Sequence, residues 1–206
     1  MSFRFFFLLS GFLSTSFFGT FAFAQIDNPI SLTVKPVYDF VDVDVDGVDF
    51  DGSLSLEVAA RISLTEQFDF EVSVTGLNEA ETDQECDNTG CYTVNINSLE
   101  SLFGGALNVY ERNQLSLFLR GGVLFYKLSV ELEETFFDIK PGGLASADDD
   151  GFGFYLGAGS KWMLNPKFGL TGEFMYRNRR DVLGDSSKPF GVSSYGVGIG
   201  LYWQLQ

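Results

Sequence analysis

The chain has 206 residues, 45% of them hydrophobic, with 13 basic and 28 acidic side chains and no histidine. Its formal net charge of −15 argues against nucleic-acid binding, which needs clustered cations to neutralise phosphates. The length suffices for one domain with a substantial core.

Residues 1–24 are predicted to be a signal peptide. Arg4 is followed by the almost wholly apolar stretch 5–21 and by Ala22-Phe23-Ala24, a small-residue cleavage site. The alternative is a retained membrane helix, which we disfavour because no basic residue follows at once. We therefore expect the folded domain to be residues 25–206, with 12 basic and 28 acidic side chains and a net charge of −16, in an oxidising compartment.

Eight segments alternate apolar and polar residues. Successive side chains of a strand point to opposite faces, so this period predicts strands with one apolar and one polar side. Between residues 54 and 64 every even position is apolar, and the odd positions are Ser55, Glu57, Ala59, Arg61 and Ser63. The predicted strands are residues 31–41, 53–64, 68–78, 94–110, 115–130, 151–164, 168–179 and 192–205.

The polar faces also carry small residues, which suit a narrow interior. In the last segment Gly196, Gly198 and Gly200 alternate with large apolar residues. A barrel with an apolar outside has lipid as its solvent, and each segment has the roughly ten residues that a tilted strand needs to cross a bilayer. We therefore predict an all-β fold, an eight-stranded antiparallel up-and-down transmembrane β-barrel.

The connections between the predicted strands alternate in length. The short ones are residues 65–67, 111–114 and 165–167, and the long ones are residues 42–52, 79–93, 131–150 and 180–191. In outer-membrane barrels short turns face the periplasm and long loops face outwards. We expect both chain ends in the periplasm and the acidic long loops at the cell exterior.

The polar faces carry five acidic and five basic residues, although the chain is strongly acidic. Isolated buried charges are costly, so this balance predicts an interior ion-pair network. Eight strands leave no aqueous channel, and we interpret the network as a structural plug; the alternative is a gated pore or a proton path. Its predicted members are Lys35, Asp39, Glu57, Arg61, Glu71, Glu100, Arg120, Lys161, Glu173 and Arg177.

Two loop features suggest cross-linking or metal binding. Cys86 and Cys91 predict a small disulfide, because an exported chain meets an oxidising compartment. A zinc site would need further ligands, and the chain has no histidine. Residues 42–47 copy the start of a calcium loop, but Ser53 stands where a bidentate glutamate is needed. A weak Ca²⁺ or Mg²⁺ site therefore competes with a merely solvated loop; its candidate ligands are Asp42, Asp44, Asp46, Asp49 and Asp51.

No catalytic residue and no cofactor are predicted. Histidine, the commonest general base, is absent, and a hydrolase would need a rarer Ser–Lys or paired-carboxylate arrangement. The glycines lie at strand spacing with no helix after them, unlike a phosphate-binding loop. Basic residues near the ends of two predicted strands either pair with lipid phosphates or extend to the membrane interface. They are Lys127, Arg177, Arg179 and Arg180.

Three stretches resemble the small outer-membrane β-barrels of Gram-negative bacteria, such as the OmpA transmembrane domain and OmpX. They are residues 116–123, 170–177 and 195–203, and the resemblance covers essentially all of 25–206. It implies a location among outer-membrane lipid and lipopolysaccharide, and insertion by the barrel-assembly machinery. Members typically end in an aromatic residue, whereas this chain ends Trp203-Gln204-Leu205-Gln206. Members with lipid-modifying or protease activity use histidine, which this chain lacks.

The expected role is structural or surface interaction, in adhesion or envelope integrity, with an extracellular surface ligand and a plugged lumen. The alternative is a narrow, porin-like passive channel for small solutes. A secreted soluble barrel of lipocalin type is a third class, and it would need the apolar faces to point inwards.

Overall fold

The computed structural model describes residues 29–43, 50–82, 84–86, 90–136, 144–182 and 190–205. The predicted signal peptide lies outside them and stays a prediction. No helix of sufficient length and hydropathy to cross a membrane occurs in this part of the chain. The described strands are β1 Ile30–Val43, β2 Ser53–Ser63, β3 Phe68–Glu81, β4 Glu85–Cys86, β5 Gly90–Arg112, β6 Leu115–Phe136, β7 Leu144–Met163, β8 Phe168–Val182 and β9 Phe190–Gln204.

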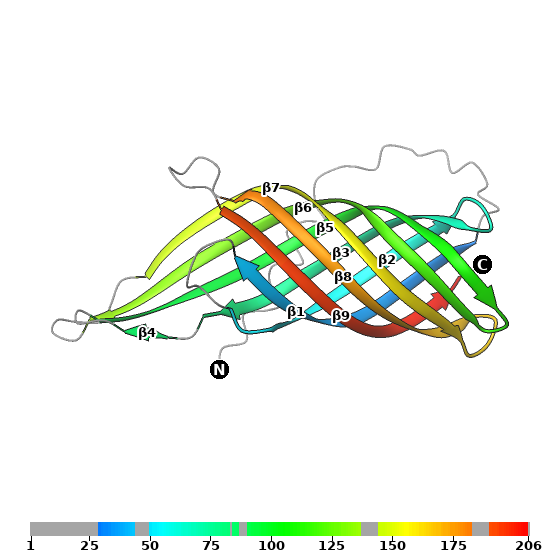
Figure 1. The fold of residues 1–206 in the computed structure, drawn as a ribbon, viewed down its shortest axis with the longest axis horizontal. Coiled ribbons are helices and arrows are strands. Elements are labelled where there is room, and N and C mark those ends of the chain that lie inside the picture. Colours follow the sequence, from blue (N-terminus) through cyan, green and yellow to red (C-terminus); the bar gives the residue numbers. More distant parts are fainter. Residues whose placement is uncertain are drawn as a thin grey trace.

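The eight long strands form a closed ring (Figure 1). Each pairs antiparallel with the next along the chain, and β4 is only a short addition beside β5. The ring closes where β1 pairs with β9, with Ser31 opposite Gln204. This confirms the predicted eight-stranded up-and-down barrel, because every long strand has a partner on both sides.

The short connections all lie at one end of the barrel, which we call the turn end; the opposite end is the loop end. The turn at residues 164–167 is held by Asn165, whose Oδ1 accepts hydrogen bonds from the backbone N–H groups of Lys167 and Phe168 at 2.9 and 3.0 Å. Asn113 has a φ of 55°, a left-handed conformation that asparagine tolerates, and this allows a two-residue turn between β5 and β6.

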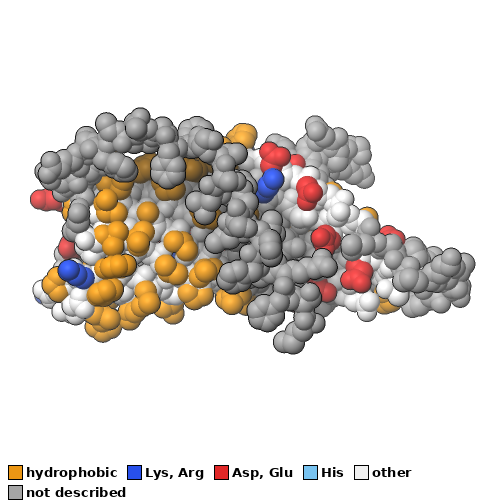
Figure 2. All heavy atoms as spheres, turned by 180° about the vertical axis from the view of Figure 1, so that it is seen from behind, with side chains coloured by type: hydrophobic (Ala, Val, Ile, Leu, Met, Phe, Trp, Pro, Cys, Tyr) orange, Lys and Arg blue, Asp and Glu red, His pale blue; other side chains and the backbone are white. Residues whose placement is uncertain are grey.

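The outer wall is apolar and the bore is largely polar. Along β2 the side chain of Val58 is 45% exposed, whereas Glu57, its neighbour in sequence, is fully buried. Figure 2 shows hydrophobic side chains gathered over the part of the wall nearer the turn end, with acidic side chains beyond them toward the loop end. This distribution confirms the predicted assignment of faces and is the reverse of a soluble barrel.

Glycines make room in the bore for long side chains. A Cβ atom added to Gly198 of β9 would lie 2.9 Å from Val37 Cγ2 of β1 and 3.0 Å from the Pro36 carbonyl oxygen. Two strands away, on β7, a Cβ on Gly157 would lie 3.1 Å from Cγ of Arg120. The inward-facing glycines predicted from the sequence thus mark where neighbouring side chains lie flat against the wall.

The strands reach further toward the loop end than predicted. Residues 131–136 and 144–150 were expected in a long loop, but they continue β6 and β7, with Glu131 opposite Ser146. The segment 131–136 carries charge on both faces, so it lacks the alternation that identifies a strand. The predicted disulfide is present: Cys86 of β4 is bonded to Cys91 of β5, directly opposite it.

Candidate functional site

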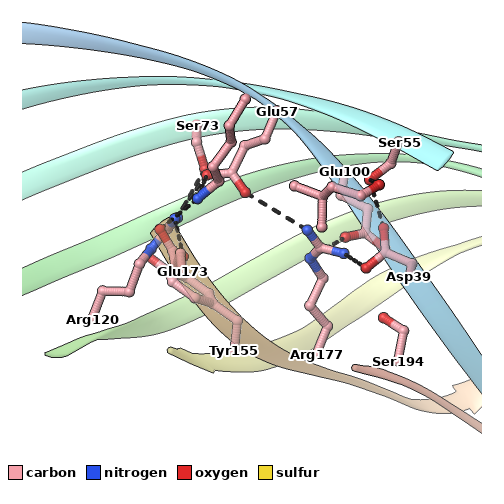
Figure 3. Close-up of polar contacts among 12 residues, drawn as sticks. Asp39, Ser55, Glu57, Ser73, Glu100, Arg120, Tyr155, Glu173, Arg177 and Ser194 are labelled. Atoms are coloured by element: carbon pink, nitrogen blue, oxygen red, sulfur yellow. Dashed lines mark hydrogen bonds and ion pairs between the residues drawn. The ribbon is translucent and has the colours of Figure 1, made fainter. Parts of the chain in front are cut away.

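An ion-pair network fills the middle of the bore (Figure 3). At its centre is Arg120 of β6, whose side chain has no exposed surface. Its Nη1 lies 2.8 Å from Glu57 Oε1 of β2 and 2.7 Å from Glu173 Oε1 of β8, and its Nη2 contacts Glu71 of β3. A single guanidinium on β6 therefore connects the neighbouring strands β2 and β3 with β8.

Two further cations complete the half of the network nearer the turn end. Lys35 of β1 places its Nζ 2.5 Å from Glu173 Oε2 and 3.2 Å from Glu57 Oε1. Arg61 of β2 donates from Nε to Glu71 Oε2 at 2.5 Å. Each carboxylate around Arg120 thus has a second basic partner, which compensates the cost of removing these charges from water.

The other half of the network lies toward the loop end. Arg177 of β8 donates from Nη1 to Asp39 Oδ1 of β1 at 2.7 Å, and Asp39 Oδ2 accepts from Ser55 Oγ at 2.5 Å. Arg179 contacts Glu100 of β5. Arg177 joins the two halves, because it also lies within ion-pair distance of Glu57 and Glu100.

Nine of the ten residues predicted for the interior lie in this network, and Lys161 does not. Its Nζ stands 4.7 Å from the centroid of the Tyr202 ring, and it makes no ion pair within the described part of the chain. Lys161 faces the bore as predicted, but it lies nearer the turn end than the carboxylates. The alternation of residues shows which face of the strand Lys161 occupies, but not how far along the barrel axis its side chain lies from the carboxylates.

Arg179 is the member that the sequence analysis missed. It was grouped with Lys127, Arg177 and Arg180 as a residue at the lipid interface, but Arg177 and Arg179 are each only 1% exposed. Lys127 and Arg180 do lie on the outside. The alternation along β8 contained the needed signal, because Arg179 is two residues from Arg177 and therefore shares its face.

An apolar layer, not predicted from the sequence, fills the bore between this network and the loop end. Its residues are the part of a larger buried apolar cluster that lies toward the loop end; they come from six strands, are at most 7% exposed, and are Val41, Val43, Ala80, Ile96, Leu128, Val182 and Val192. Val41 and Val43 share the inward face of β1 with Lys35 and Asp39. The inward face thus changes from polar to apolar along one strand.

The network is suited to closing the bore and holding the wall in shape. With Arg179 included it contains five acidic and five basic side chains, and each carboxylate has a basic partner. No group of three potential metal ligands occurs among the residues that the structure describes. Of the calcium candidates, Asp42 and Asp51 are exposed, and the other three lie outside the described residues.

The family model for the outer membrane protein beta-barrel domain matches residues 10–203. Neisserial surface protein A is similar in structure, with a TM-score of 0.56 and 11% identity over 85% of this chain and 97% of that one. The outer membrane protein OprG from Pseudomonas aeruginosa is also similar in structure, with a TM-score of 0.51 and 13% identity over 87% of this chain and 96% of that one. No curated protein matches the chain by sequence. With a family match over most of its length and a closed eight-stranded ring, the chain belongs to the outer-membrane β-barrel proteins.

Proposed function

We propose that this protein is a closed, non-catalytic outer-membrane barrel that acts by surface interaction at its loop end, in adhesion or envelope integrity. The observation that carries this proposal is the sheet formed by β5, β6 and β7, which extends beyond the other strands at that end (Figure 1). We further propose that the loop end faces outwards and the turn end faces the periplasm, as the connection lengths favour.

The projecting part of the sheet is acidic. On β6 the exposed apolar residues of the outer wall end at Phe125. The strand continues over residues 127–136, a length of about 30 Å at roughly 3.3 Å per residue. Its acidic residues lie on β6 and β7; they are Glu131, Glu133, Glu134, Asp148, Asp149 and Asp150. Such a surface favours a cationic partner.

One edge of this sheet is open. β7 pairs with β6 from Leu144 onwards, but its pairing with β8 begins only at Gly153. Within the described residues no strand is paired with the other side of 144–152. An open edge carries unpaired N–H and C=O groups, to which an extended peptide can add as a further strand. The partner that fits is therefore an extended basic segment.

The filled bore supports surface interaction over the alternative of a passive channel. The ion-pair network and the apolar layer occupy successive levels along the barrel axis. We expect no steady conductance from the protein in planar bilayers, and a stable open state would favour the channel. A non-catalytic role is supported by the pairing of the bore carboxylates, since none of the five is left as a free general base.

The test uses the folded protein in nanodiscs and a fluorescent synthetic peptide of alternating lysine and valine. Replacing Asp148 and Asp150 together by asparagine should weaken binding about tenfold, whereas replacing Glu66 and Glu111 at the turn end by glutamine should not. Proline is then placed separately at Ser146 and Ala147, because only one of two adjacent residues directs its N–H to the open edge. If neither proline weakens binding while the gel mobility of the folded barrel is retained, strand addition at this edge is wrong.

A further inference from the structure

Several polar atoms in the bore are buried and have no hydrogen-bond partner. Five of them belong to Thr75 and to three residues of the network: Nε and Nη2 of Arg177, Oε2 of Glu57, Oε2 of Glu100 and Oγ1 of Thr75. All four residues are at most 2% exposed. A buried polar atom without a partner is energetically unfavourable, so such a concentration needs an explanation.

These five atoms lie together. Thr75 of β3 stands directly between Glu57 of β2 and Glu100 of β5 in the strand register, and all three face the bore. Arg177 approaches from the opposite wall, with its Nη2 3.6 Å from Glu57 Oε2 and its Nε 3.5 Å from Glu100 Oε2 (Figure 3). These separations are longer than the direct bond of 2.7 Å between Arg177 and Asp39.

The chemistry of these atoms defines the ligand. Arg177 supplies donors, the two carboxylate oxygens are acceptors, and the Thr75 hydroxyl can act as either. A ligand that bridges them must both donate and accept hydrogen bonds and must be small, because all four side chains are tightly enclosed. Polar atoms that lie slightly too far apart for a direct hydrogen bond are often bridged by a small molecule between them.

The charge balance decides between a neutral ligand and an ion. The network already contains five acidic and five basic side chains, so a bound ion would leave an uncompensated charge in the network. We propose that Arg177, Glu57, Glu100 and Thr75 form a buried water-binding site. The water joins the two halves of the network, which Arg177 otherwise links only by long contacts.

The position of the site also predicts how the water behaves. Toward the loop end it is covered by the apolar layer, and toward the turn end by Arg120 with Glu71 and Glu173. Exchange with bulk water therefore requires the bore to open locally, and the bound molecule should stay for far longer than a surface water.

The test is a nuclear Overhauser measurement between water and arginine side-chain N–H groups in the deuterated, folded protein in detergent micelles. We expect a cross-peak between water and the Nε–H of Arg177, with the sign of a long-lived complex. Thr75→Val removes one hydrogen-bonding group with little change of shape and should abolish or strongly reduce the peak. Thr33→Val, an equally buried inward-facing threonine of β1, should leave it unchanged.

Direct pairing of Arg177 with both glutamates is the competing explanation. A wild-type spectrum without that cross-peak would establish it and overturn the proposal, even if the Thr75 variant fails to fold. A small cation is the other competitor: a peak that disappears when choline replaces sodium as the only cation in the buffer would also overturn the proposal.

Discussion

Replacing Arg120 by methionine should destabilise the barrel more than any other single change of charge in the bore. The substitution removes the partner that Glu57, Glu71 and Glu173 share and leaves one uncompensated negative charge in a site that is fully buried. Removing one member of a buried ion pair costs about 3–5 kcal/mol. Lys35 and Arg61 remain as partners, so we expect a value near the lower limit.

The measurement is urea unfolding of the protein in lipid vesicles, followed by tryptophan fluorescence and by the change in gel mobility of the unheated barrel. With a slope of about 2 kcal/mol per M, a loss of about 3 kcal/mol lowers the midpoint by about 1.5 M. Adding Glu57→Gln restores neutrality and should recover part of the loss, whereas Arg112→Met at the exposed turn end should change little. If the midpoints of Arg120→Met and Arg112→Met coincide, the network does not hold the barrel together.

Three further predictions test the wall, the loop end and the faces. Gly198→Leu should lower the unfolding free energy by about 1–3 kcal/mol, because the new Cβ would press on β1. Gly172→Ala should not lower it, because the atom nearest to the new Cβ would be 3.9 Å away. Equal urea midpoints for the two variants would contradict the packing role of Gly198. Cys86→Ser should speed proteolysis near the β4–β5 pair yet leave the gel mobility of the barrel unchanged, because the disulfide lies outside the ring. A nitroxide at Ile199 should be relaxed by oxygen dissolved in the bilayer, and one at Asp148 by a water-soluble nickel chelate; the opposite pattern would invert the assignment of faces.

Much of the architecture follows from local geometry and could be predicted. Successive side chains of any strand point to opposite faces, so the alternation along β2 alone places Glu57 and Arg61 inside and Val58 outside. The same rule assigns the inward face of the other strands, and it would have included Arg179 had it been applied one residue pair further along β8. The short turns could be recognised because asparagine, proline and polar residues interrupt the alternation.

Other features depend on where a residue lies along the barrel axis, which the alternation does not report. Lys161 has the predicted face but the wrong depth, so it rests on Tyr202 instead of entering the network. The apolar layer was missed for a related reason, since Val41 and Val43 look like ordinary members of an alternating strand. The extension of β6 and β7 was missed because residues 131–136 present charge on both sides.

The amino-acid sequence by itself determined the class of fold, the side of the wall on which each strand residue lies and the balance of charge within the bore, because all three follow from side-chain direction and composition. Only the tertiary structure decided which acid meets which base. Arg120 meets Glu173 because β6, β7 and β8 pair in one register, and it meets Glu57 across the bore because the pairing of β1 with β9 closes the ring. The alternation of residues along one strand encodes neither the register between strands nor the pairing of β1 with β9, which lie far apart in the chain.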